Sequence, residues 1–274
     1  MALGPVRFMA FGRGAARARR GAAAEPRQDP VFAPPVAELA PPPVEFEPPK
    51  PVLRAPARPE GGGMIPIAEF LLRARQLGIM DRRILSAIES IPRPPFLDIG
   101  ARSGPLYAER PQPIACGQLS TPPMVVARLL TALSPGEHDR VLEIGTGTGY
   151  LAAVMSRLVR RVYTLDRFRT LVSAAEARFL QVGVENVTPI FADGNTAWPD
   201  KAPFDVIVST ASAPVPPPLW IEQLATRGAL VMPIGPADGE QMLTLFRRSD
   251  RSLAATPICP VRLLPLIAGK AQRL

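Results

Sequence analysis

The amino-acid sequence predicts an α/β protein: a doubly wound, mostly parallel sheet with an antiparallel C-terminal edge, preceded by a small N-terminal helical subdomain. From residue 139 onward, short apolar runs rich in β-branched residues alternate with helical patterns. Such alternation is typical of parallel strands joined by helices that cover both faces of the sheet. The last three strand patterns have no helical pattern between them, which predicts the antiparallel edge.

The expected elements follow in order along the chain. In the N-terminal part, the spacing of apolar residues predicts helices over 67–77, 81–90 and 122–133. Beyond residue 139 the predicted strands are 140–144, 161–166, 187–192, 204–209, 227–233, 240–247 and 257–264. The predicted helices between these strands are 149–159, 168–182 and 216–225.

Three segments make up the expected domain organisation. Residues 1–63 hold 13 of the 35 prolines and end in three glycines, so we expect a disordered tail that cannot offset its ordering entropy. Five arginines and no acid among the first 24 residues would also suit a targeting segment, although serine is absent there. Residues 64–138 are expected to form the N-terminal helical and substrate-side segment, and residues 139–274 the ligand-binding α/β domain.

The composition limits the classes of function. The net charge of +8 is spread over the chain, with 9 Lys/Arg against 6 Asp/Glu in residues 1–63 and 23 against 18 in the remainder. We therefore expect a mildly basic, solvated surface, with a nucleic-acid face as the alternative. Two cysteines in 274 residues predict no disulfide framework and favour a reducing, cytoplasmic location. The apolar runs are too short for a membrane span, and the residue pattern suggests no metal site.

The most informative stretch is VLEIGTGTGY, residues 141–150. A strand pattern enters a turn with glycine at every second position, and a helical pattern follows, which is how backbone approaches a nucleotide-like ligand closely. The third glycine of the dinucleotide pattern G-x-G-x-x-G would fall at position 150, where this chain has Tyr150. Glu143 would repel a pyrophosphate at the helix N-terminus and would favour a ligand with an ammonium and a sulfonium.

Two further acids end predicted strands. Asp166 closes the second strand, 21 positions after Gly145, where an acid hydrogen-bonds a ribose hydroxyl in such units. Asp193 and Gly194 follow the third strand, where a ligand's adenine would lie or where the pair would simply form a turn. With Glu143, these positions make E-x-G-x-G-x-G resemble the S-adenosylmethionine loop of class I methyltransferases, which have a Rossmann-like fold.

Three segments together resemble the protein-L-isoaspartate (D-aspartate) O-methyltransferase family. IPRPPF at 91–96 is similar to the family's V-P-R-x-x-F, and PIACGQLSTP at 113–122 is similar to its I-G-x-G-Q-T-I-S-x-P. VLEIGTGTGY matches V-L-E-I-G-T-G-x-G-Y throughout, and LVMPIG at 230–235, Gln241 and PVRLLPL at 260–266 add support. The resemblance covers residues 65–268 and leaves the tail outside.

The family pattern has G-Q-T-I-S where this chain has Gly117-Gln118-Leu119-Ser120. We interpret the segment of this chain as one residue shorter than the family pattern. Aligned from Ser-x-Pro, Ser120 matches the active-site serine of the family. The resemblance thus implies that Ser120 is catalytic and steers a substrate carboxylate. The alternative is that Ser120 caps the helix that follows.

The resemblance implies an S-adenosyl-L-methionine-dependent O-methyltransferase that acts on isoaspartyl residues of damaged proteins or peptides. We also expect a monomer that does not bind nucleic acid. Because a carboxylate is ionised at neutral pH, it needs no general base, and positioning carries the catalysis. A methyltransferase for RNA or a small molecule, or a non-catalytic cofactor-binding paralogue, are the alternatives. The predicted cofactor-binding residues are Gln118, Leu119, Ser120, Glu143, Gly145, Thr146, Gly147, Thr148, Gly149, Asp166, Arg167, Asp193, Gly194 and Gln241.

Overall fold

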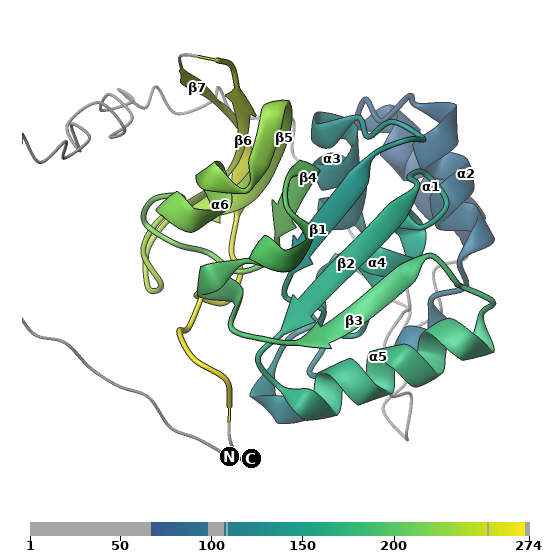
Figure 1. Ribbon diagram of the computed structural model, residues 1–274. Coiled ribbons are helices and arrows are strands. Elements are labelled where there is room, and N and C mark those ends of the chain that lie inside the picture. Colours follow the sequence, from purple (N-terminus) through teal and green to yellow (C-terminus); the bar gives the residue numbers. More distant parts are fainter. Residues whose placement is uncertain (1–66, 98–106, 108, 251, 272–274) are drawn as a thin grey trace, which may run out of the picture. The chain divides into compact units, whose positions relative to one another are not determined.

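The computed structural model describes residues 67–97, 107, 109–250 and 252–271 (Figure 1). The chain divides into two units, 1–38 and 39–274, and every described residue belongs to the second. The predicted tail, 1–63, lies outside the described residues.

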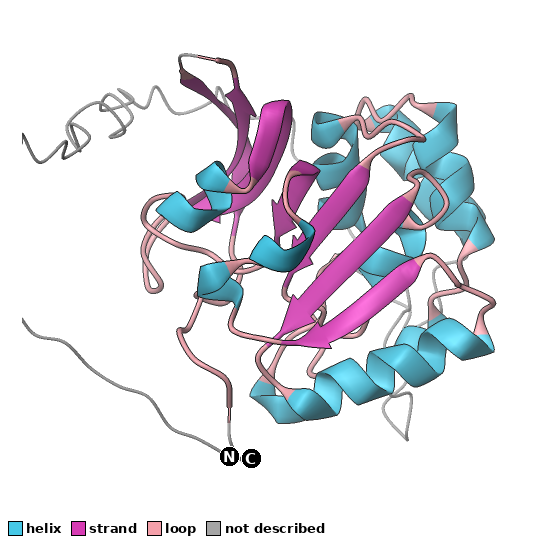
Figure 2. Cartoon of the chain, in the orientation of Figure 1, coloured by secondary structure: helices cyan, strands magenta, loops and turns pink. Residues whose placement is uncertain are grey.

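A seven-stranded sheet with the order β3-β2-β1-β4-β5-β6-β7 forms the centre of this unit (Figure 2). The first five strands are parallel and the last two pair antiparallel. The predicted fold class, with its antiparallel C-terminal edge, is therefore confirmed. The strands are β1 (Arg140–Ile144), β2 (Arg161–Asp166), β3 (Val187–Phe191), β4 (Phe204–Ser209), β5 (Leu224–Ile234), β6 (Gln241–Arg248) and β7 (Leu253–Val261).

Helices cover both faces of the sheet. On one face, a core of valines from β1, β2 and β4 packs under the N-terminal helices and under the helices that follow β1 and β2. The other face is covered by shorter elements, and Trp220 is its largest fully buried side chain. The helices are α1 (Ile67–Gln76), α2 (Arg82–Ser90), α3 (Pro123–Leu133), α4 (Tyr150–Met155), α5 (Arg169–Gln181) and α6 (Pro218–Glu222), with short 3-10 turns at Pro94–Phe96, Ala115–Gly117, Gly194–Thr196 and Pro199–Lys201.

Several predicted boundaries were wrong. The helix predicted over 216–225 is only α6, because the chain enters β5 at Leu224, and α4 ends at Met155 rather than at residue 159. The last strand was predicted over 257–264 but runs over Leu253–Val261, paired along its length with β6. Its two prolines, Pro257 and Pro260, are tolerated because β7 is an edge strand.

Beyond β7 the chain leaves the sheet and crosses the ends of the parallel strands. Ser212 N–H donates to the carbonyl of Leu264 at 2.9 Å, and Leu266 N–H donates to the carbonyl of Ser212 at 2.8 Å. The segment after β7 is thereby fixed beside the loop that follows β4. Both lie at the carboxyl ends of parallel strands, where ligands bind in doubly wound folds.

Candidate active site

The glycine turn joins β1 to α4 and needs its glycines for two separate reasons. Gly145, Gly147 and Gly149 all have positive φ, at 98°, 52° and 88°, a region that L side chains rarely adopt. A Cβ on Gly145 would also lie 2.8 Å from Thr210 Oγ1, and a Cβ on Gly149 would lie 2.9 Å from the Phe179 ring. The turn therefore presents bare backbone at the end of β1.

Asp166 joins this turn to the end of β2. Its Oδ2 accepts from Gly147 N–H at 2.9 Å and its Oδ1 from Phe168 N–H at 3.0 Å. Burial raises the pKa of the Asp166 carboxyl, and these two hydrogen bonds act in the opposite direction. Because a carboxylate offers about four lone-pair sites, Asp166 can still accept from the hydroxyls of a ligand.

Glu143 lies buried within β1, beneath the glycine turn. Its Oε2 accepts from Thr164 Oγ1 at 2.5 Å, and Thr164 Oγ1 is in turn 2.7 Å from Thr146 Oγ1 in the turn. Within the described part of the chain, Glu143 Oε1 has no hydrogen-bond partner. Burial raises the pKa of Glu143 to about 8, with Thr164 opposing the shift and nearby Asp166 adding to it. The unpartnered oxygen suits a cationic group.

A hairpin over residues 112–120 lies opposite the glycine turn. Ile114 N–H donates to the carbonyl of Gln118 at 2.9 Å, and Ser120 N–H donates to the carbonyl of Gln112 at 2.8 Å. Cys116, at the tip of the hairpin, has a positive φ of 64°. Ile114 reaches toward the turn, since its Cδ1 would lie 3.8 Å from a Cβ on Gly147.

A pocket forms where the hairpin, the glycine turn and the segment after β7 meet, and we call it the cofactor pocket. It is lined by Pro111, Gln118, Leu119, Ser120, Thr121, Gly145, Gly147, Asp166, Leu171, Thr210, Ala211, Arg262, Leu263, Leu264 and Pro265. Six of the predicted site residues thus come together: Gln118, Leu119, Ser120, Gly145, Gly147 and Asp166. Residues 143–149 and 166 are brought together through the turn itself.

Other predicted site residues lie outside the lining of this pocket. Asp193 Oδ1 accepts from Asn195 N–H at 2.9 Å and Asp193 Oδ2 from Gly269 N–H at 2.8 Å, so the carboxylate ties the C-terminal segment to β3. The next residue, Gly194, packs tightly, since a Cβ there would lie 2.6 Å from Ile144. Arg167 stacks its guanidinium 5.3 Å from the Phe168 ring centroid.

Gln241 is buried at the start of β6 and links the segments around it. Its Nε2 donates to Ser212 Oγ at 3.0 Å and to the carbonyl of Leu263 at 3.1 Å, while its Oε1 accepts from Leu263 N–H at 2.8 Å. Gln241 therefore holds the segment after β7 in place beside the cofactor pocket.

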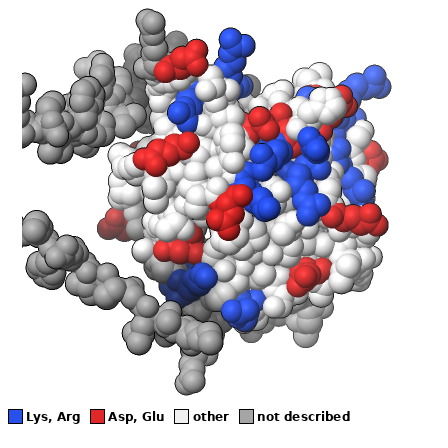
Figure 3. Space-filling view, viewed as in Figure 1, with Lys and Arg blue, Asp and Glu red and all other residues white. Residues whose placement is uncertain are grey.

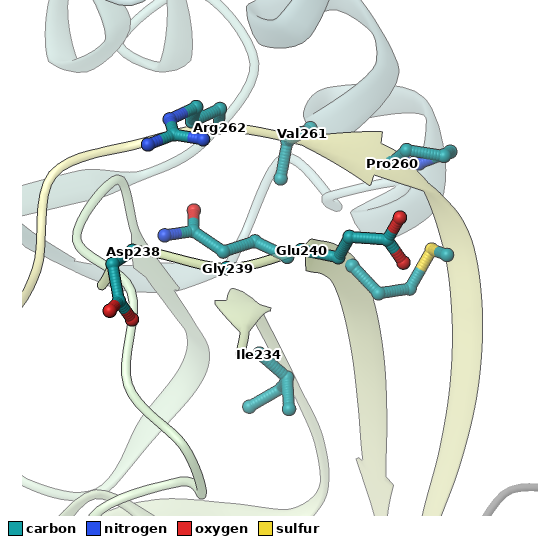
Figure 4. A pocket seen from close by; sticks show the side chains of 9 residues that line it. Ile234, Asp238, Gly239, Glu240, Pro260, Val261 and Arg262 are labelled. Atoms are coloured by element: carbon teal, nitrogen blue, oxygen red, sulfur yellow. The ribbon is translucent and has the colours of Figure 1, made fainter. Parts of the chain in front are cut away.

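A second pocket of about 710 Å³ adjoins the cofactor pocket and shares Arg262 with it (Figure 4). Figure 4 shows Pro260, Val261 and Arg262 along one side of this pocket and Asp238 and Glu240 along the other. The second pocket thus shares the basic Arg262 with the cofactor pocket and is also lined by the acidic residues Asp238 and Glu240.

Nine residues that line the cofactor pocket were not among the predicted site residues, and three of them have polar side chains: Thr121, Thr210 and Arg262. Thr121 lines the cofactor pocket, Thr210 closes against Gly145, and Arg262 joins the two pockets. Arg262 had a signal in the PVRLLPL segment, and Thr121 had one in its position next to Ser120. Thr210 lies in a loop after β4 that matched no recognised pattern.

The sole histidine, His138, is exposed in a loop and lies 3.4 Å from Glu137. Among the described residues, no group of three or more His, Cys, Asp or Glu could hold a metal ion, and no described helix is long and apolar enough to cross a membrane. On the face seen in Figure 3, basic and acidic side chains are interspersed, with a denser group of basic residues at the upper right.

Comparisons with known proteins agree with this geometry. The family model for protein-L-isoaspartate(D-aspartate) O-methyltransferase matches residues 68–271. A protein-L-isoaspartate O-methyltransferase from Paramagnetospirillum magneticum is 42% identical over 209 residues, covering 74% of this chain and 95% of that protein. The protein of the same name from Paracoccus denitrificans is 44% identical over 203 residues, covering 74% and 94%.

Solved structures show the same fold. One named protein-L-isoaspartate O-methyltransferase has a TM-score of 0.67 at 27% identity and covers 74% of this chain and 67% of its own. A second, from Plasmodium falciparum in complex with S-adenosyl-L-homocysteine, has a TM-score of 0.61 at 21% identity and covers 72% and 96%. With a family model matched over most of its length and relatives above 40% identity, this chain belongs to the protein-L-isoaspartate (D-aspartate) O-methyltransferase family.

Proposed function

We propose that this protein transfers a methyl group from S-adenosyl-L-methionine to the free carboxylate of isoaspartyl residues in damaged proteins or peptides. The observation that carries the proposal is the cofactor pocket. There, the glycine turn and Asp166 of the α/β domain face the 112–120 hairpin, which comes from the N-terminal segment. A cofactor and an acceptor group can therefore meet between two parts of the chain.

The residues present fit the cofactor. Asp166 would accept from the ribose hydroxyls, and the backbone of Gly145, Thr146, Gly147, Thr148 and Gly149 permits close approach. Glu143, with its unpartnered Oε1, would face the positive charge of the methionine part, and that charge would favour the ionised form of its carboxyl. Asp193 and Gly194 would border the adenine end, Arg167 lies beside Asp166, and Gln241 supports the pocket by holding Leu263.

When bound, S-adenosylmethionine supplies a sulfonium methyl group that a carboxylate oxygen takes by in-line displacement, giving a methyl ester and S-adenosylhomocysteine. An ionised carboxylate needs no general base, and its pKa near 4 keeps it ionised at neutral pH. The task of the chain is therefore to hold the carboxylate in line and to exclude water, and such positioning contributes up to roughly 7–11 kcal/mol. The exposed His138 is consistent with a reaction that needs no proton transfer.

The second pocket would take the residues that flank the isoaspartate. Arg262, at the junction, would attract the substrate carboxylate, while Asp238 and Glu240 would favour basic flanking residues. We further propose that the protein acts as a monomer in the cytoplasm, which suits an enzyme that must reach many damaged proteins.

Transfer of a labelled methyl group to three acceptors tests the function. The acceptors are an isoaspartyl peptide, the same peptide with ordinary aspartate, and an RNA pool. We expect base-labile label in the isoaspartyl peptide alone. Label in RNA would support the rival methyltransferase class, and cofactor binding without any transfer would support a non-catalytic paralogue.

Asp166→Ala tests the cofactor site within the same function. Loss of a buried acceptor costs about 1–3 kcal/mol, so the dissociation constant for S-adenosylmethionine should rise roughly 5- to 150-fold. Calorimetry measures it directly, and Asp200→Ala, at an exposed position away from the pocket, is the matched control. Unchanged affinity in Asp166→Ala would reject the ribose assignment.

A further inference from the structure

Ser120 and Thr121 both line the cofactor pocket, but their hydroxyl groups are in different situations. Ser120 is buried at 4% exposure, and its Oγ accepts from Gln112 N–H at 3.0 Å. Ser120 N–H also donates to the carbonyl of Gln112, so Ser120 forms two hydrogen bonds to the backbone of Gln112 within the hairpin. The hydroxyl of Ser120 is thus turned toward the backbone of residue 112.

Thr121 is half-buried, and within the described part of the chain its hydroxyl makes no hydrogen bond. It is the last residue before Pro122, which occupies the N-cap position of α3 without a side-chain cap. Neither Ser120 nor Thr121 therefore caps the helix. The Thr121 hydroxyl remains free to bond a ligand in the pocket.

A comparison without gaps gives a second register of this segment against the family pattern. Ile114, Gly117, Gln118 and Pro123 match the first, fourth, fifth and tenth positions of I-G-x-G-Q-T-I-S-x-P. The pattern then covers residues 114–123 without a gap, and the serine of the pattern falls on Thr121. In this register the segment has the same length as the family pattern, in contrast to the alignment from Ser120.

The buried side chain of Arg93 contacts the backbone of Thr121. It is 2% exposed, its Nη2 donates to the carbonyl of Thr121 at 3.0 Å, and its guanidinium lies 4.7 Å from the centroid of the Tyr150 ring. Its Nε has no partner, and no ion pair links it to a carboxylate among the described residues. Burying a cation without a paired carboxylate costs folding free energy. We therefore expect Arg93 to have a function at its position between Thr121 and Tyr150, the first residue of α4.

We infer that the hydroxyl of Thr121, rather than that of Ser120, contacts the substrate carboxylate, and that Arg93 is the residue that positions it. Arg93 connects the carbonyl of Thr121 to Tyr150, which directly follows the glycine turn. The hydroxyl-bearing segment and the cofactor-binding turn therefore keep a fixed relation to one another. The inference rests on the proposed function, because it assigns a role within the same transfer reaction.

Substitutions that separate the two hydroxyls test the assignment, with an isoaspartyl peptide as acceptor. Thr121→Val keeps the side-chain shape but removes the hydroxyl, and it should lower kcat 10- to 100-fold with the affinity for S-adenosylmethionine and the melting temperature retained. Thr121→Ser should restore most of the rate. Thr131→Val, on the exposed side of α3, is the matched control and should behave like the wild type.

Ser120→Ala should instead lower the melting temperature, because it removes the acceptor of Gln112 N–H, and should lose less turnover than Thr121→Val. The assignment is overturned if Thr121→Val keeps the wild-type kcat, or if Ser120→Ala loses at least as much turnover at its wild-type melting temperature. Absence of transfer by the wild type would contradict the proposed function itself, which is a distinguishable result.

A double-mutant cycle tests the positioning role of Arg93. Arg93→Lys should lower kcat about 10-fold in the wild-type background and have little further effect in Thr121→Val, because both changes act through one hydroxyl. Additive losses would overturn the positioning role. If Arg93→Lys fails to fold, Arg93→Gln, which keeps a donor for the Thr121 carbonyl, is measured in the same cycle.

Discussion

At the scale of single residues, Glu143 is a carboxyl buried beneath the glycine turn. It is fully buried and its pKa is raised to about 8, with burial as the main cause. In the unfolded chain a glutamate has its ordinary pKa near 4.3, so between these two values the folded state binds a proton that the unfolded state releases. The free energy of unfolding therefore falls as the pH rises from about 5 to 8.

Glu143→Gln imitates the protonated side chain and should remove this pH dependence. Each unit of pKa shift corresponds to 1.36 kcal/mol, so the variant should become more stable than the wild type by a few kcal/mol near pH 8 and should equal it near pH 4.5. Urea unfolding across this pH range measures the difference. Glu185→Gln, at an exposed position, is the control. A wild-type stability that stays level from pH 5 to 8 would show that Glu143 is ionised throughout.

At the scale of elements, the glycine turn determines how closely β1 and α4 can approach a ligand. Gly149 combines a φ of 88° with a predicted Cβ contact of 2.9 Å to Phe179, so two effects oppose any side chain there. Gly183 has a similar φ of 66°, but no atom lies within 4 Å of its Cβ position. A comparison of alanine substitutions at the two glycines therefore distinguishes the cost of backbone strain from the cost of overpacking.

Gly149→Ala should therefore destabilise the fold more than Gly183→Ala does. A left-handed alanine costs roughly 1–2 kcal/mol, and forcing a methyl group into a packed site adds about 1–3 kcal/mol. Denaturant unfolding of both variants gives the comparison. Equal losses would mean that Phe179 moves aside and that packing against α5 does not require glycine at position 149.

The elements show what the sequence could predict and why the rest escaped prediction. The strands β1, β2 and β4 are mostly buried and rich in apolar, β-branched residues, so their positions followed from the pattern. The edge strand β7 was misplaced because its exposed residues carry no such pattern. At the site, Ser120 and Thr121 are adjacent hydroxyls before two adjacent prolines, and only the start of α3 shows which proline begins the helix.

At the scale of the whole molecule, the described core begins at Ile67 and the family match at residue 68. A shortened chain that begins at Met64 should therefore keep the melting temperature and the affinity for S-adenosylmethionine of the full chain. Thermal unfolding and calorimetry on the two chains check this expectation. A large loss of either property would show that residues 1–63 contribute to the folded domain and would move its boundary toward the N-terminus.

The central claim is that one chain brings a cofactor methyl group to an isoaspartyl carboxylate. The most direct measurement gives the full-length protein S-adenosylmethionine and one peptide that contains both an aspartate and an isoaspartate, and then locates the added mass by fragmentation. We predict one methyl group per peptide, on the isoaspartyl residue, with an equal amount of S-adenosylhomocysteine. Methylation of the ordinary aspartate, or S-adenosylmethionine bound without any methylated peptide, would contradict the account.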